Sequence, residues 1–288
     1  MTDQPFVVLK LGGELLESAD DLQAIATVIA RAGSGTPLVV VHGGGREIDA
    51  ALAAAGLPKQ QVDGLRITDA PTLDIVVHVL AGSVNTRLVA AVVTHGGRGV
   101  GLTGADDGIG IVERADLHAT SDGCLVDLGL VGQPTSDSRL DLLRDLCRGG
   151  YVPIVSCIGL GRDGRLFNVN ADVLAAHFAA GLRARRLVIA GGTSGVLDTA
   201  GQTIPRLSLD DIDGLVARGT ASAGMIAKLR AASTAAGRGV ERIVIVNGRN
   251  PQALRSAMVI SAAPELGRCN DATVIQTQLA IGHSVEHP

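Results

Sequence analysis

Short runs of Val, Ile and Leu recur along the chain and are separated by longer segments with the period of amphipathic helices. The five clearest runs are Phe6–Leu11, Leu38–Val41, Val152–Ile158, Leu187–Ala190 and Ile243–Val246. Their apolar residues are continuous rather than alternating, which is typical of strands that are buried on both faces of a sheet. We therefore predict an α/β fold with a mostly parallel sheet and helices on both of its faces.

The helical pattern predicts seven helices. They are expected at Asp20–Ala32, Arg46–Ala55, Pro71–Val93, Leu140–Arg148, Ala171–Ala180, Leu209–Arg218 and Met225–Ala236. Ser18 followed by Asp21 resembles a capping signal at the start of the first helix. The Gly- and Asp-rich stretch Gly96–Ser138 is expected to form hairpins or a flap, and the Arg-rich link Gly181–Arg186 is the expected boundary between two lobes.

The composition excludes several classes of protein. A chain of 288 residues that is 46% hydrophobic, with a net charge of -4, is not disordered. Aromatic residues make up only 1%, and Lys and Arg (25) do not exceed Asp and Glu (29), so we expect no nucleic-acid partner. No apolar window reaches the roughly 18 uninterrupted residues of a membrane span, and the N-terminus does not resemble a signal peptide. The four scattered cysteines are expected to be buried free thiols, which favours a cytoplasmic protein.

Two G-x-G-x-x-G matches are not expected to bind a dinucleotide. The first, Gly99–Gly104, leads into a turn, and the second, Gly159–Gly164, ends in a hairpin signal. A dinucleotide site needs the third glycine to open a helix. The seven histidines show no ligand spacing, so no metal site is predicted. We interpret His42 as a structural ring at a strand end.

Two other glycine loops follow expected strands. The first strand ends in Lys10-Leu11-Gly12-Gly13, and the second ends in His42 followed by three glycines, just before a helix. Glycines at such positions let backbone N–H groups approach an anion, and the helix terminus adds positive potential. Tight strand-to-helix turns are the alternative, but three consecutive glycines exceed what a turn needs.

Lysine usage points to the same end of the sheet. Only Lys10, Lys59 and Lys228 are lysines among the 25 basic residues. A lysine that is kept beside a glycine pair, or at the start of a helix as Lys228 is, suggests that a compact ammonium group is required there. Lys59 is interpreted as an ordinary surface residue, which is also the alternative for the other two.

The segment Asn168-Val-Asn170-Ala-Asp172 precedes an expected helix. Such residues cap helices, but one cap does not need three of them. The carboxylate of Asp172 is therefore a candidate to orient nearby ammonium groups. Arg66 is a candidate to clamp a carboxylate with two parallel hydrogen bonds.

Six segments together resemble the acetylglutamate kinases, of the amino acid kinase family. They are K-L-G-G, V-V-H-G-G-G, G-L-R-I-T, V-D-L-G-L-V-G, N-V-N-A-D and G-M-I-A-K, which follow the family's order from residue 6 to about 250. The resemblance implies a three-layer αβα sandwich of two lobes and a homodimer. The N-terminal lobe (1–182) would bind the acyl amino acid and dimerise, and the C-terminal lobe (183–288) would bind ATP.

By motif position, the resemblance also implies a role for each site residue. Lys10 and Lys228 would stabilise the transferring phosphoryl group, and Asp172 would organise these lysines. Gly44, Gly45, Arg66 and Asn168 would hold the acyl amino acid. The implied nucleotide-binding residues are Gly12, Gly13, Gly192, Thr193, Ser194, Gly195, Leu197 and Ser222.

The implied reaction is ATP-dependent phosphorylation of the γ-carboxylate of N-acetyl-L-glutamate, in arginine biosynthesis, with Mg²⁺ carried by the nucleotide. This nucleophile is already ionised at neutral pH, so no general base is required. Two alternatives stay open: a sister kinase of another N-acylated acidic amino acid, and a non-catalytic amino acid sensor on the same fold. Five residues precede the first expected strand, so we expect no N-terminal helix of the kind that links arginine-inhibited relatives into hexamers.

Overall fold

The computed structural model describes residues 4–120, 123–217, 222–259 and 271–276, and its centre is one eight-stranded sheet. The strand order is β14-β16-β15-β13-β1-β2-β10-β5. All neighbours are parallel except β15 and β16. The strands are β1 (Val7–Leu11), β2 (Leu38–His42), β5 (Gly99–Thr103), β10 (Val152–Ser156), β13 (Arg186–Gly191), β14 (Arg206–Leu207), β15 (Arg242–Asn247) and β16 (Ala272–Gln276).

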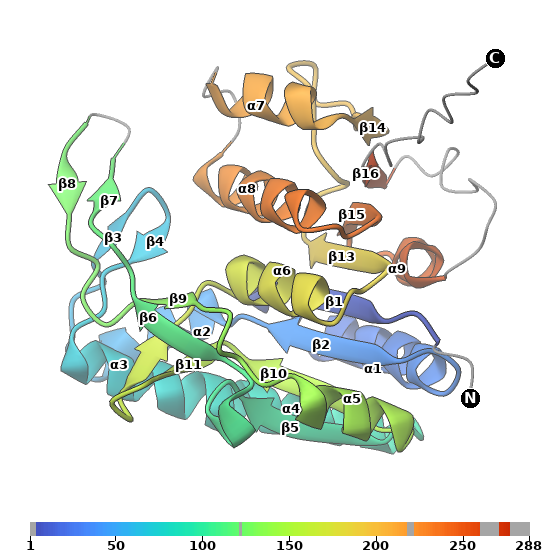
Figure 1. Cartoon of the computed structure of the whole chain (residues 1–288), viewed down its shortest axis with the longest axis horizontal. Helices are drawn as coiled ribbons and strands as arrows, with labels where there is room; N and C mark the ends of the chain where they lie inside the picture. Colours follow the sequence, from blue (N-terminus) through green and yellow to red (C-terminus); the bar gives the residue numbers. More distant parts are fainter. Residues whose placement is uncertain (1–3, 121–122, 218–221, 260–270, 277–288) are drawn as a thin grey trace, which may run out of the picture.

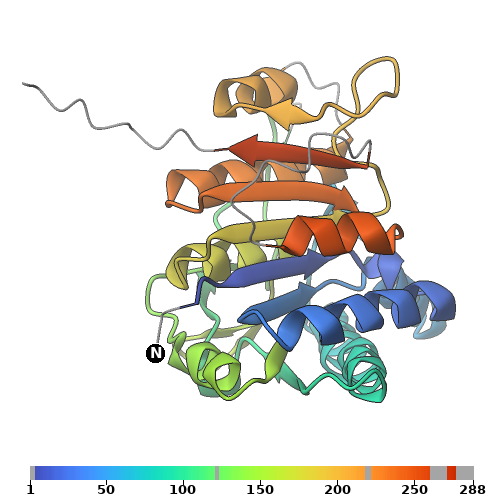
Figure 2. The same cartoon turned by 90° about the vertical axis from the view of Figure 1, so that its right-hand side faces the viewer.

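Helices cover both faces of this sheet (Figures 1 and 2). One face packs against α1 (Ala19–Gly33), α4 (Asn85–Thr94) and α9 (Pro251–Met258), and the other against α5 (Asp141–Arg148), α6 (Ala171–Gly181) and α8 (Ala223–Gly237). The remaining helical elements are α2 (Gly45–Ala54), α3 (Ala70–Val77), α7 (Leu209–Ala217), the 3₁₀ turns η1 (Gly13–Leu15) and η3 (Asp106–Gly108), and the π-helical segment η2 (His78–Val84). The predicted three-layer α/β sandwich with a mostly parallel sheet is confirmed.

A smaller four-stranded sheet and two hairpins complete the described chain. The sheet has the order β12-β11-β6-β9, formed by β12 (Leu166–Asn168), β11 (Ile158–Gly161), β6 (Ile111–Arg114) and β9 (Gly132–Pro134). The hairpins are β3 (Gln61–Val62) with β4 (Leu65–Arg66), and β7 (His118–Ala119) with β8 (Leu125–Val126). Both hairpins extend beyond the end of the main sheet where β2 and β13 terminate (Figure 1, left).

All five apolar runs form strands, and the long run Val152–Ile158 contains the whole of β10 and the first residue of β11. Both G-x-G-x-x-G matches form strands and turns, as predicted. Ser18 accepts a hydrogen bond from the N–H of Asp21 at 3.4 Å, which confirms the cap. The stretch Gly96–Ser138 contains the expected β7–β8 hairpin, but it also supplies β5, an edge strand of the main sheet. Its Gly-rich sequence lacks the apolar run that marked β1, β2, β10, β13 and β15.

The expected boundary at Gly181–Arg186 lies between α6 and β13. The main sheet continues across it, because β13 pairs with β1 in parallel register from Val7–Arg186 to Leu11–Ala190. Cys147 and Cys157 are buried as expected, whereas Cys124 is exposed. Cys269 and the first three residues lie outside the described part of the chain.

The continuous helical segment Ala70–Thr94 is long and apolar enough to cross a membrane by length and composition, with a mean hydropathy of 1.6. Apolar core helices of soluble proteins satisfy the same criterion, and this segment packs on α1, β5 and β10. Polar side chains of the segment also bond to the central sheet: Asn85 donates to the carbonyl of Ile154 in β10 at 2.8 Å. The segment thus packs on the central sheet, and 39% of its most apolar 18-residue window is buried.

Candidate active site

A buried ion pair between Lys10 and Asp172 forms the centre of the site. Lys10 lies in β1 and shares with Val8 the face that packs against α6. Its Nζ lies 2.9 Å from Oδ1 of Asp172, and the two side chains are only 7% and 9% exposed. Asn170 is the helix cap, since its side chain accepts from the N–H groups of Asp172 and Val173 at 2.8 and 3.2 Å. The carboxylate of Asp172 is therefore free to hold the ammonium group rather than cap the helix.

Lys228 reaches the same region from the first turns of α8, whose cap is Ser222. The ammonium group lies against Gly191 at the end of β13, where an added Cβ would come within 2.4 Å of Nζ. Burial and the nearby charge of Lys10 lower the pKa of Lys228, while the carboxylates of Asp172 and Glu14 oppose that shift. The structure thus brings both predicted lysines and Asp172 together.

The two glycine loops touch each other at the carboxyl ends of β1 and β2. A Cβ on Gly13 would lie 2.6 Å from Cα of Gly44 and 2.9 Å from the N of Gly45, so only glycine permits this approach. Helix α2 begins at Gly45, and its N-cap, Gly44, provides no side-chain hydrogen bond. The first N–H groups of α2 are consequently available to an anion.

His42 has the predicted structural role at a strand end, where its ring contacts the second glycine loop. The ring is buried, with Nδ1 3.2 Å from the carbonyl of Gly43 and Nε2 3.0 Å from Nδ2 of Asn85. Burial lowers the pKa of His42 to about 4. A neutral ring that donates from Nδ1 and accepts at Nε2 satisfies both contacts, which assigns His42 to structure rather than proton transfer.

Arg66 approaches the start of α2 from β4. Its Nη2 donates to the carboxylate of Asp49 and to the carbonyl of Gly45, while Nη1 is buried and has no partner among the described residues. Asn168 lies nearby, since its Nδ2 donates to Oγ1 of Thr68 at 3.1 Å. A buried guanidinium nitrogen without a partner is costly, and a ligand carboxylate at this place would satisfy it.

The loop after β13 is different, because most of its polar groups bond within the protein. The N–H of Gly192 donates to Oε1 of Glu14 at 3.1 Å, and Oγ of Ser194 lies 2.8 Å from Oδ1 of Asp271. Gly195 has φ +77°, which favours glycine, and a Cβ there would meet Oγ1 of Thr273 at 2.5 Å.

The other predicted nucleotide-binding residues lie around this loop. Oγ1 of Thr193 donates to the carbonyl of Gly195 at 3.3 Å, Leu197 is an exposed apolar side chain, and the N–H of Gly12 donates to the carbonyl of Ala190 at 3.0 Å. Their assignment to the nucleotide stays a prediction.

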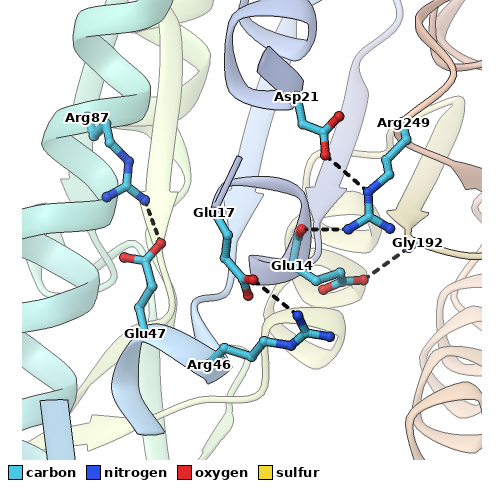
Figure 3. Close-up of polar contacts among 8 residues, drawn as sticks. All are labelled: Glu14, Glu17, Asp21, Arg46, Glu47, Arg87, Gly192 and Arg249. Carbon is cyan, nitrogen blue, oxygen red and sulfur yellow. Dashed lines mark hydrogen bonds and ion pairs between the residues drawn. The ribbon is translucent and has the colours of Figure 1, made fainter. Parts of the chain in front are cut away.

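Two charged residues of this region were not predicted from the sequence. Glu14 follows the first glycine pair, and Arg249 follows β15. Arg249 donates from Nη2 to the carbonyl of Glu14 at 3.1 Å and from Nε to Asp21 at 3.0 Å (Figure 3). The position of Glu14 directly after the first glycine pair was the signal that could have found it.

A cavity of about 560 Å³ lies beside the site, between the outer sides of α6 and α8 and the two hairpins. It meets the site at Asn170 and Leu65, but Lys10, Asp172 and Lys228 do not line it. The three charged residues therefore lie at the edge of the sheet, outside this cavity.

The fold and the site define an α/β protein that gathers ammonium groups, glycine loops and an arginine at the carboxyl edge of a parallel sheet. The chain belongs to the amino acid kinase family, whose model matches residues 5–247.

Acetylglutamate kinase from Aromatoleum aromaticum is 39% identical over 249 residues, which cover 84% of this chain and 82% of that protein. Acetylglutamate kinase from Dinoroseobacter shibae is 37% identical over 252 residues, covering 87% and 84%.

Solved structures share the fold at lower identity. N-acetylglutamate synthase from Neisseria gonorrhoeae, complexed with coenzyme A and N-acetyl-glutamate, has a TM-score of 0.78 and 24% identity, with 94% of this chain and 59% of that chain covered. Carbamate kinase from Giardia lamblia bound to AMP-PNP has a TM-score of 0.67 and 16% identity, with 96% and 100% covered.

Proposed function

We propose that the protein phosphorylates the γ-carboxylate of N-acetyl-L-glutamate with ATP, as a step of arginine biosynthesis. The observation that carries this proposal is the buried Lys10–Asp172 pair with Lys228 beside it, at the same sheet edge as the unpartnered Nη1 of Arg66. The acetylglutamate kinases to which the chain is similar support the choice of substrate.

The chemistry requires alignment and charge neutralisation rather than proton transfer. An oxygen of the ionised γ-carboxylate attacks the γ-phosphorus of ATP, and the bond from this phosphorus to the bridging oxygen breaks, giving an acyl phosphate and ADP. Charge on the transferred group is spread over its oxygens, so two ammonium groups and backbone N–H donors can supply the stabilisation. Asp172 keeps the Lys10 ammonium in place through the buried ion pair.

The acceptor is held at the other end of the site. We assign its α-carboxylate to Nη1 of Arg66 and to Asn168, because Nη1 is buried and unpartnered within the described residues. The N-terminus of α2, at Gly44 and Gly45, then offers N–H groups to the acceptor. The side chain of Arg66 is fixed in position, because its Nη2 donates to Asp49 and to the carbonyl of Gly45.

Mg²⁺ is proposed to be carried by the phosphates of ATP. Among the described residues, no group of three or more His, Cys, Asp or Glu is placed to hold a metal ion. The ion would supply positive charge on the phosphate oxygens, while the lysines remain the protein's own contribution.

We further propose a cytoplasmic homodimer. The main sheet ends at β5, whose residues are only partly covered, and the adjacent apolar helix α4 leaves Val93 52% exposed. A second copy placed against this edge would cover both the strand and the helix. Light scattering of the purified protein tests this directly, and a monomeric mass would reject the dimer.

A coupled assay of ADP release, with hydroxylamine trapping of the acyl phosphate, tests the reaction. The panel contains N-acetyl-L-glutamate, N-acetyl-L-aspartate, N-acetyl-L-aminoadipate and N-succinyl-L-glutamate. We expect the highest kcat/KM with N-acetyl-L-glutamate, and for Lys228→Ala a kcat about 10²–10³ lower with little change in the KM of the acyl substrate. Preference for another acid would indicate the sister kinase. Binding of acyl amino acids without turnover would indicate the sensor.

A further inference from the structure

The side chain of Glu14 folds back into the first glycine loop. Glu14 is the middle residue of η1, and a Cβ on Gly12 would lie only 2.3 Å from its carboxylate. The same carboxylate accepts the N–H of Gly192 at 3.1 Å. Gly12 and Gly192 thus leave the space that Glu14 occupies, between the ends of β1 and β13.

This carboxylate shares that space with the ammonium group of Lys228. A Cβ on Gly191 would meet Nζ of Lys228 at 2.4 Å and Oε1 of Glu14 at 3.3 Å. Both charged groups therefore pack over the same glycine. They come from elements far apart in the sequence, η1 and α8.

Arg249 fixes the backbone that presents Glu14. Its guanidinium group donates to the carbonyl of Glu14 and to the carboxylate of Asp21 in α1, and Figure 3 shows it on one side of η1 with the Glu14 carboxylate turned toward Gly192. Because Arg249 binds the carbonyl and not the carboxylate of Glu14, the charge of Glu14 remains available to the lysines.

One positive and two negative side chains lie around Lys228. The groups that act on it are Lys10 from β1, Asp172 from α6 and Glu14 from η1. Asp172 is already paired with Lys10 at 2.9 Å, and no ion pair to Lys228 occurs in the described part of the chain. Among the described residues the Glu14 carboxylate forms no ion pair, and the nearby Arg249, which packs over Gly192, pairs with Asp21.

We propose that Glu14 is a positioning residue for the phosphoryl transfer: its carboxylate attracts the Lys228 ammonium toward Gly191 through its charge, without a direct ion pair, while Asp172 holds Lys10 directly. The inference rests on the proposed function for its kinetic consequence, but the charge coupling between Glu14 and Lys228 is testable without turnover. Glu14→Gln isolates the charge, because the amide oxygen can still accept the N–H of Gly192.

The first test measures the ionisation of Lys228 in the full chain by competitive acetylation across pH, with mass spectrometry. The chain has only three lysines, and the exposed Lys59 is the internal reference. Glu14→Gln should lower the pKa of Lys228 by about one unit, since a carboxylate within a few ångströms favours the ammonium form. Glu17→Gln is the matched control, because Glu17 pairs with Arg46 on the surface (Figure 3). An unchanged Lys228 titration in Glu14→Gln overturns the proposal.

The second test is the pH profile of the kinase reaction. In Glu14→Gln the alkaline limb of kcat/KM should move to lower pH with the Lys228 titration, and kcat should fall along that limb, while Glu17→Gln keeps the wild-type profile. If KM for ATP falls and kcat is unchanged, the carboxylate merely occupies the place of a phosphate, and the positioning role is wrong. Wild-type protein without kinase activity rejects the proposed function and leaves the labelling result to decide on Glu14.

Discussion

The proposed acceptor end and the proposed nucleotide end of the site differ in how their polar groups are satisfied. At the acceptor end, Nη1 of Arg66 is buried without a partner in the described residues, and the start of α2 has no side-chain cap. At the nucleotide end, Gly192 bonds to Glu14 and Ser194 bonds to Asp271. The acceptor end is therefore prepared to receive an anion, whereas a nucleotide that uses these groups must exchange existing bonds for new ones. The following predictions test this difference.

Asp172→Asn should have the largest effect, because it removes the charge that pairs with the buried Lys10. We expect kcat to fall about 10²–10³-fold. Thermal unfolding should show a folded but less stable protein. Asn170→Ala is the control: it removes the cap of α6, at about 1 kcal/mol, and leaves the ion pair in place. Equal loss of turnover in both variants would mean that Asp172 acts only through the start of the helix.

Arg66→Lys should affect the acceptor end selectively. The ammonium group keeps the charge but cannot bond Asp49 and a ligand carboxylate with separate nitrogens, so KM for the acyl substrate should rise about 10- to 100-fold with a smaller change in kcat. Steady-state kinetics with both substrates measure this. Arg87→Lys, which alters an exposed pair with Glu47, provides the comparison (Figure 3). A rise confined to KM for ATP would place Arg66 outside the acceptor site.

Acidic pH should destabilise the fold through His42, the buried ring that contacts the glycine loop of the acceptor end. The folded-state pKa of His42 is about 4, below its ordinary value of 6.5, so the neutral ring contributes stability above pH 6.5 that is lost as the pH falls toward 4. The full loss corresponds to about 3 kcal/mol. His177, whose pKa burial also lowers to about 4, contributes similarly. Urea unfolding measures the difference in the free energy of unfolding between pH 7 and pH 4.5, and in His42→Gln roughly half of this difference should be lost. The same difference in the variant as in the wild type would contradict the assignment.

Two glycine substitutions should give the smallest effects, a loss of stability at one end and almost no change at the other. Gly195→Ala forces an L-residue to φ +77° against Thr273, which should cost about 1–3 kcal/mol of stability. Gly45→Ala meets no atom within 4 Å, so its melting temperature should stay near that of the wild type. Differential scanning calorimetry distinguishes them. Comparable melting of both variants would show that the loop after β13 relaxes easily.

Much of this site could be predicted because its residues stand at the ends of patterned elements. Lys10 is the last residue but one of an apolar run that two glycines follow, and Asp172 and Lys228 lie in the first two turns of helices. Parallel strands place all their carboxyl ends at one edge, so these residues had to meet there. The edge strand β5 was missed because Gly99 and Gly101 alternate with its apolar residues, so its sequence contains no continuous apolar run.

The sequence by itself determined the parallel sheet, the helices on its faces and the edge where the lysines gather, because local burial periodicity encodes each of these. The tertiary structure alone decided which carboxylate meets which cation. Glu14 and Gly192 are 178 residues apart, and Arg249 is 235 residues from the carbonyl that it binds. Such pairs depend on the order of strands in the sheet, and a carboxylate in a strand-end loop has the same local sequence whether it contacts solvent, a helix N-terminus or a lysine.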